Sequence, residues 1–141
     1  MPTRNAEARW DGGIMDGNGT MRLGSGAFEG SYSFKTRMED GAGTNPEELI
    51  GAAHAGCFSM ALSAALGQAG FQPRSIETKA AVRFDKVEGG FSITKIDLTT
   101  SADIPNIDDS KFQEIAKSAK ENCPVSKALA GTEINLQASL K

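Results

Sequence analysis

The chain has 141 residues, enough for one domain with a buried core that does not depend on a disulfide or a metal. Its net charge of −3 and pI near 5.2, without any run of three basic residues, argue against nucleic acid or an anionic membrane as the main partner. The N-terminus lacks the apolar segment of a signal peptide, so we expect a cytoplasmic protein whose two cysteines are reduced.

The first third of the chain has the pattern of strands separated by glycine-rich turns. Apolar and polar residues alternate over 6–10 and 20–23, and turn residues follow each run. The aromatic residues within 28–34 predict a third strand that runs toward Arg37. The glycines follow no phosphate-loop pattern and no helix is expected to begin beside them, so phosphate binding is not expected.

A long helix is predicted over residues 46–67. Asn45 is a favourable N-cap residue, Pro46 suits the first helical position, and Glu48 has the spacing of a capping box. Residues 49–66 carry no formal charge, which approaches the length of a membrane-spanning helix. Their many small residues and the lack of flanking basic and aromatic anchors favour instead a helix buried on nearly every side. A second copy of the helix is one way to cover so apolar a surface.

The second half of the chain alternates between strands and helices. Apolar residues alternate along 76–84 and along 91–98, with a hairpin turn between these runs and a change of phase that suggests a bulge in the second. The remaining predicted elements are a helix that begins after Asp108 or Asp109 and ends near Asn122, a short helix from Pro124 to about Ala130, and a strand over 134–140. The order β-β-β-α-β-β-α-α-β predicts a single α+β domain over residues 1–141.

Two cysteines are the main candidates for chemistry, because a thiolate is a strong nucleophile. Cys57 lies in the apolar helix, where a free cysteine more often packs as a small hydrophobe. Cys123 precedes Pro124 at the predicted start of a helix, whose N–H groups and dipole favour a thiolate. An ordinary loop or cap residue is the more common interpretation of such a cysteine when it is considered alone.

His54 precedes Cys57 by three residues, which places the two side chains near each other on the helix. This spacing allows the nucleophilic pair of a thiol hydrolase. A packed, hydrogen-bonded histidine is favoured, because no third group that would orient the imidazole is visible. One histidine and two cysteines that lie 66 residues apart have no ligand spacing of a known kind, so no metal site is expected.

Three segments resemble the OsmC/Ohr family of organic hydroperoxide reductases, and the OsmC subgroup most closely. They are Thr44-Asn45-Pro46-Glu47-Glu48-Leu49, His54-Ala55-Gly56-Cys57-Phe58-Ser59-Met60 and Asn122-Cys123-Pro124-Val125-Ser126. Residues 36–39, 67–71 and 90–96 are also similar, so the likeness covers nearly the whole chain. The resemblance implies an intertwined homodimer in which two long central helices are clasped by sheets from both chains.

The resemblance also implies a thiol-dependent peroxidase. Cys57 is then the peroxidatic cysteine, which becomes a sulfenic acid, and Cys123 is the resolving cysteine, which forms a disulfide with it. The family's arginine and carboxylate fall on Arg37 and Glu47. The expected partners are an organic hydroperoxide and an external dithiol reductant such as a lipoyl group, without a bound cofactor. Apolar residues near the nucleophile are expected to bury the tail of the substrate, namely Leu49, Phe58 and Met60.

The positions of these residues add one geometric expectation. Glu47 and Cys57 are ten residues apart, which is about 15 Å along a straight helix and roughly 80° around it. We therefore expect Glu47, together with Arg37, to reach Cys57 from the other subunit. Gly56 departs from the alanine that is common in related sequences. The alternative function is a non-catalytic dimer that binds a small hydrophobic ligand between its apolar helices.

Overall fold

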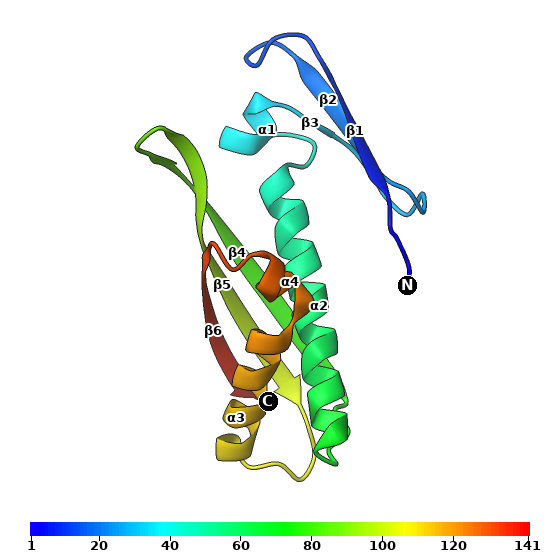
Figure 1. Cartoon of the computed structure of the whole chain (residues 1–141), viewed down its shortest axis with the longest axis vertical. Helices are drawn as coiled ribbons and strands as arrows, with labels where there is room; N and C mark the ends of the chain where they lie inside the picture. The colour runs from blue at the N-terminus through cyan, green and yellow to red at the C-terminus, as the bar shows by residue number, and fades with distance from the viewer. The chain divides into compact units, whose positions relative to one another are not determined.

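The computed structural model describes residues 1–141, which group into two compact units, residues 1–49 and 50–141. It confirms the predicted α+β class, with two three-stranded sheets and a long helix (Figure 1). The elements in chain order are β1 (Ala6–Asp11), β2 (Asn18–Leu23), β3 (Glu29–Tyr32), α1 (Phe34–Met38), α2 (Pro46–Gln68), β4 (Ser75–Val87), β5 (Gly90–Asp103), α3 (Asp109–Asn122), α4 (Pro124–Ala128) and β6 (Glu133–Leu140).

The first unit contains an antiparallel sheet in the order β1-β2-β3. Gly19 of β2 pairs with Trp10 on one side and with Tyr32 on the other. The two aromatic rings lie 5.4 Å apart between centroids, and a Cβ atom added at Gly19 would approach ring atoms of both to less than 3 Å. Glycine at this position therefore allows the aromatic contact that joins β1 to β3.

The third strand is shorter than the sequence predicts. It ends at Tyr32, and the residues expected to continue it toward Arg37 form the helix α1. Ser33 is the N-cap of α1: its Oγ accepts from the backbone N–H of Thr36, and its own N–H donates to Thr36 Oγ1 at 2.8 Å. This capping box satisfies backbone donors locally and overrides the aromatic pattern that suggested a strand. Arg37 consequently lies on a helix.

The second unit contains a mixed sheet in the order β4-β5-β6. β4 and β5 form the predicted hairpin, and the predicted bulge is present: Arg83 pairs with Lys95 and Phe84 with Ile93, which leaves Thr94 without an opposite residue. β6 pairs with β5 in parallel. A parallel pair requires a crossover connection, and α3 and α4 provide it.

The core of the second unit lies between α2 and α3 on one side and the inner face of the sheet on the other (Figure 1). Gly51 of α2 lets the helix approach β4 closely, since a Cβ there would lie 3.3 Å from Cγ2 of Val82. Of the two predicted caps of α3, Asp108 and Asp109, the structure has Asp108, which accepts from the N–H of Lys111. The buried hydrophobic residues are Phe58, Leu62, Leu66, Ile96, Leu98, Ala102, Ile104, Phe112, Ile115, Ala116, Ala119 and Cys123.

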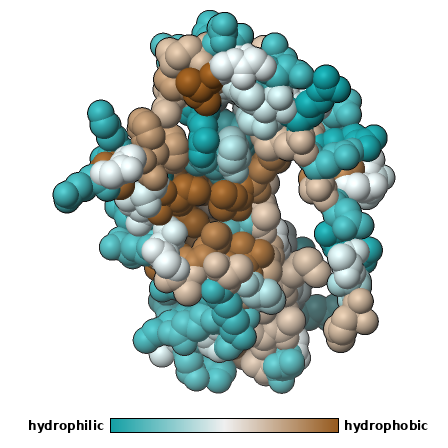
Figure 2. Space-filling model, turned by 45° about the horizontal axis from the view of Figure 1, so that its top comes forward, coloured by the Kyte–Doolittle hydropathy of each residue, from teal (hydrophilic) through white to brown (hydrophobic).

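The expectation that α2 is buried on nearly every side is wrong for the single chain. Its buried residues within the second unit form one stripe, at Gly51, His54, Phe58, Leu62 and Leu66. The exposed positions of α2 are mostly small or apolar. Hydrophobic residues are also visible on the surface of the chain in Figure 2. By length and composition alone α2 is able to cross a membrane, a test that the core helix of a water-soluble protein also passes.

Candidate active site

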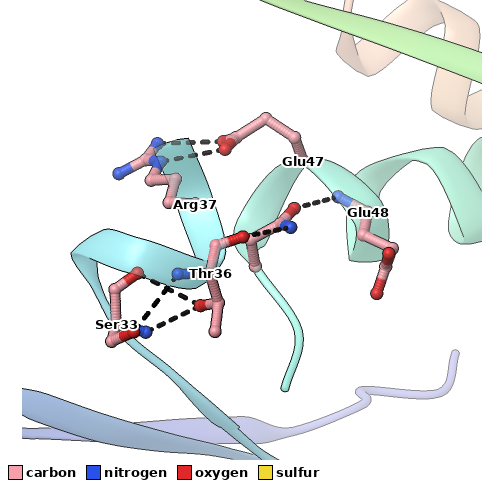
Figure 3. Close-up of polar contacts among 6 residues, drawn as sticks. Ser33, Thr36, Arg37, Glu47 and Glu48 are labelled. Atoms are coloured by element: carbon pink, nitrogen blue, oxygen red, sulfur yellow. Dashed lines mark hydrogen bonds and ion pairs between the residues drawn. The ribbon is translucent and has the colours of Figure 1, made fainter. Parts of the chain in front are cut away.

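Arg37 and Glu47 form a two-pronged ion pair within the first unit (Figure 3). Arg37 Nε donates to Glu47 Oε1 at 2.9 Å, and Nη2 donates to Oε2 at 2.9 Å. The Glu47 side chain is only 10% exposed, whereas that of Arg37 is 37% exposed. Bidentate pairs of this kind fix the plane of the guanidinium. The geometry orients the arginine and leaves part of it accessible.

The chain around this pair is held by caps at the starts of two helices (Figure 3). Asn45 accepts from the N–H of Glu48 at 2.8 Å, as predicted for the N-cap of α2, and its Nδ2 donates to the carbonyl oxygen of Thr36 at 3.0 Å. The carboxylate of Glu48 accepts from the hydroxyl of Thr44 rather than closing the capping box. The two Asn45 bonds join α1 to the first turn of α2, and they thereby hold Arg37 close to Glu47.

The two cysteines meet within the second unit. Cys57 is partly buried on α2, and Cys123 is fully buried at the junction of α3 and α4. Their Sγ atoms lie 3.1 Å apart, and both residues are free thiols. Because a disulfide bond is about 2.05 Å long, a movement of about 1 Å is enough to join them.

The surroundings shift the pKa values of the two thiols in opposite directions. Burial raises the pKa of Cys57, and the adjacent Cys123 raises it further, against a lowering by the backbone N–H of Val125. Burial also raises the pKa of Cys123, but hydrogen bonds from the backbone N–H and side chain of Ser126, from Cys57 and from Val125 outweigh it and lower the pKa overall. Within the second unit the thiolate is therefore favoured at Cys123 over Cys57.

The lowered pKa of Cys123 agrees with the prediction that N–H groups at the start of this helix favour a thiolate. α4 has only five residues, and the Cys123 thiol does not meet the geometry of a side-chain cap. The stabilisation comes from nearby donors of Val125 and Ser126, which act over one turn.

His54 is the buried, hydrogen-bonded histidine that was favoured from the sequence. It has no exposed surface, and its Nε2 lies 2.8 Å from Oγ of Ser126. Burial lowers its pKa. Its polar partner is therefore Ser126 rather than Cys57, which does not support the nucleophilic pair of a thiol hydrolase. No cluster of three or more potential ligands is present for a metal ion.

The structure thus brings the predicted residues together as two pairs, Arg37 with Glu47 and Cys57 with Cys123. Phe58 differs from its expected role: it has no exposed surface and packs into the core, so it does not line a surface open to substrate. Ser126 was not singled out from the sequence. Its position three residues after Cys123, on the first turn of a helix, is the signal that identifies it as a neighbour of the thiol.

Comparisons with known proteins agree on one family for this chain. Residues 39–138 match the family described as OsmC-like protein. The chain is 52% identical to the peroxiredoxin OsmC of Escherichia coli over 98% of this chain and 96% of that protein. It is 35% identical to the organic hydroperoxide resistance protein OhrB of Bacillus subtilis over 74% of this chain and 75% of that protein.

Solved structures agree with the sequence comparison. The crystal structure of OhrB of Bacillus subtilis superposes with a TM-score of 0.70 at 28% identity, covering 97% of this chain and 98% of that one. An organic hydroperoxide resistance protein from Elizabethkingia anophelis gives a TM-score of 0.74 at 25% identity, over 100% of this chain and 96% of that one. The likeness therefore extends over both units of the chain.

Proposed function

Because this chain belongs to the OsmC-like protein family and is a hydroperoxide-reducing peroxidase, we propose that it reduces organic hydroperoxides to alcohols through Cys57 and Cys123. One observation carries the proposal: two free thiols from distant parts of the chain lie with their sulfur atoms 3.1 Å apart. A pair of thiols at this distance is able to give two electrons to a hydroperoxide: both S–H bonds are lost, an S–S bond forms, and the O–O bond of the hydroperoxide is reduced.

In the first step the thiolate of Cys57 attacks the O–O bond of the hydroperoxide. An S–O bond forms, the O–O bond breaks, and the leaving oxygen takes a proton to give the alcohol, while the sulfur is oxidised to a sulfenic acid. Because burial raises the pKa of Cys57, this step needs a cation at the sulfur. We assign that role to Arg37, which Glu47 holds by two hydrogen bonds and which would also stabilise charge on the leaving oxygen.

In the second step Cys123 attacks the sulfenic sulfur of Cys57. The S–S bond forms, the S–O bond breaks, and the oxygen leaves as water. An external dithiol, of which a lipoyl group is the expected kind, then reduces the disulfide by thiol exchange and is itself oxidised. No step uses a prosthetic group or a metal. A reductant of this type is consistent with the proposed cytoplasmic location, where thiols are kept reduced.

We further propose that the active protein is a homodimer formed through α2, in which residues 1–141 of each chain act as one domain. The support is the face of α2 left uncovered in the single chain, where Met60 is 76% exposed. The other exposed positions on this face are small, namely Ala52, Ala53, Gly56, Ser63, Ala64 and Gly67. Small residues allow two helices to approach closely, and a second α2 would cover this face.

Gly56→Arg tests the dimer. A side chain at Gly56 meets nothing within 4 Å in the single chain, and arginine favours a helix over glycine by about 1 kcal/mol, so the chain should still fold. Burying its unpaired charge at an interface costs several kcal/mol, so the dissociation constant of the dimer should rise by more than about a hundredfold. Sedimentation velocity measures this.

The matched control is Gly131→Arg, the same substitution at an exposed turn position that also has open space around it. It should leave the dimer intact. A Gly56→Arg protein that remains as dimeric as the control would contradict the proposed interface.

The substrate class is tested by rapid mixing of the reduced protein with tert-butyl hydroperoxide or with hydrogen peroxide. Each buried methylene contributes about 0.8 kcal/mol, so the alkyl hydroperoxide should oxidise Cys57 at least about tenfold faster. Acid quenching, maleimide labelling and mass spectrometry follow the thiol. A rate with both peroxides no higher than that of a free thiol would favour the alternative function, a dimer that binds a small hydrophobic ligand without turning it over.

A further inference from the structure

A buried series of polar side chains leads to the segment that carries Cys123, and the mechanism above does not use it. It begins at His54 on α2, which is fully enclosed, and crosses to Ser126 on α4, which is 7% exposed. The two side chains are 72 residues apart in sequence, and His54 Nε2 lies 2.8 Å from Ser126 Oγ. The other ring nitrogen of His54, Nδ1, is buried and has no hydrogen-bond partner. A polar group enclosed in this way costs stability, so its retention calls for a reason.

The unpartnered Nδ1 identifies the tautomer of His54. The imidazole is neutral, since burial lowers its pKa. A buried N–H without an acceptor is rarer and more costly than a buried lone pair without a donor. The proton therefore sits on Nε2, which donates to Oγ of Ser126.

This direction leaves the hydroxyl hydrogen of Ser126 free to point elsewhere. A serine oxygen that accepts from an imidazole N–H still has one O–H to donate. Ser126 lies three residues after Cys123, and donation from its side chain lowers the pKa of that thiol. The chain of donors thus runs in one direction, from His54 to Ser126 and from Ser126 to Cys123.

We propose that His54 and Ser126 are positioning residues for the resolving cysteine: their hydrogen bond joins α4 to α2 one turn away from each cysteine and keeps the Cys123 sulfur directed at Cys57. This proposal rests on the two-cysteine mechanism proposed above and concerns only its second step. When Cys123 attacks, its sulfur forms the S–S bond, the S–O bond of the Cys57 sulfenic acid breaks, and the leaving hydroxide takes up a proton to become water. After this step the Ser126 hydroxyl faces the Cys123 sulfur of the disulfide, which carries no charge.

The experiment separates the two steps in time. Reduced protein is mixed with tert-butyl hydroperoxide, and sulfenic acid is trapped with dimedone at successive times while the disulfide is counted by mass spectrometry. Formation of the sulfenic acid depends on peroxide concentration, whereas formation of the disulfide does not. Ser126→Ala removes one hydrogen bond to the thiolate, which should slow the second step roughly tenfold and leave the first within about twofold. More dimedone adduct should accumulate as a result.

His54→Leu and His54→Gln form a matched pair. Leucine removes the donor to Ser126 and should slow disulfide formation, whereas glutamine keeps an N–H donor and should restore most of the rate. The double variant Ser126→Ala/His54→Leu should be no slower than Ser126→Ala alone, because both changes interrupt the same chain.

A separate measurement excludes a purely structural role. In the Cys57→Ser background, where the other thiol is absent, the ultraviolet absorbance of the thiolate gives the pKa of Cys123, and Ser126→Ala should raise it. An unchanged Cys123 pKa together with an unchanged second step would overturn the proposal, as would equal slowing of both steps. Absence of the first step in the unsubstituted protein would instead refute the two-cysteine mechanism itself.

Discussion

Replacing Cys57 with serine is expected to abolish hydroperoxide consumption, leaving only the rate of the uncatalysed reaction. The hydroxyl of serine does not ionise near neutral pH and forms no sulfenic acid, so the first step has no nucleophile. The change replaces one sulfur atom with oxygen at a partly buried position, so the fold should stay intact, which circular dichroism verifies. Consumption is measured by following tert-butyl hydroperoxide in the presence of excess dithiol.

Cys123→Ser should give a different result, and the contrast between the two variants is the stronger test. Here Cys57 still reacts, so about one equivalent of alcohol should form per chain before the reaction stalls for lack of an internal resolving thiol. The sulfenic acid should be trapped by dimedone on Cys57. Full multiple-turnover activity in Cys57→Ser, or activity that is lost equally and at the first step in both variants, would contradict the assigned roles.

A mixed dimer is expected to reveal whether each site is built from two chains. One chain carries Cys57→Ser, and the other carries Arg37→Ala with Glu47→Gln, which removes the ion pair without leaving a buried charge. If Arg37 serves the Cys57 of its partner, the mixed dimer holds one complete site and should keep about half the activity of the unsubstituted dimer. Removing such a group from both sites should cost about 10²–10³ in rate.

The control for the mixed dimer places all three substitutions in one chain and none in the other. A site shared between chains then has the nucleophile of one chain without its arginine, so activity should fall by the full factor. A site within one chain predicts the reverse order of the two mixed dimers. Differently tagged chains, purified in sequence for both tags, supply each species, and peroxide consumption ranks them.

The start of α2 shows how far local sequence determines structure. Asn45 and Pro46 specify the first turn, and the structure places the Asn45 side chain on the N–H of Glu48 as predicted. The hairpin of β4 and β5, its bulge, and the helix capped by Asp108 were also predictable, because turn and capping residues act on their immediate neighbours.

Features that depend on distant contacts were not predictable in the same way. The parallel pairing of β6 with β5 joins residues about forty positions apart, and nothing in the alternating pattern of β6 specifies its direction. α1 was missed because the Ser33 cap outweighs the aromatic pattern, and the burial of α2 was overestimated because its composition does not reveal which face is covered. The approach of Cys57 to Cys123 followed from family resemblance, since their spacing alone indicates no contact.

The same approach of sulfur atoms has a topological consequence for the reaction cycle. Cys57 and Cys123 are 66 residues apart, so in the proposed cycle each oxidation would close a covalent ring through α2, β4, β5 and α3, and each reduction would open it. By chain entropy a ring of this size restricts the unfolded chain by about 4 kcal/mol. The disulfide form is therefore expected to resist unfolding more than the reduced form, and the reductant would act on the more stable of the two states.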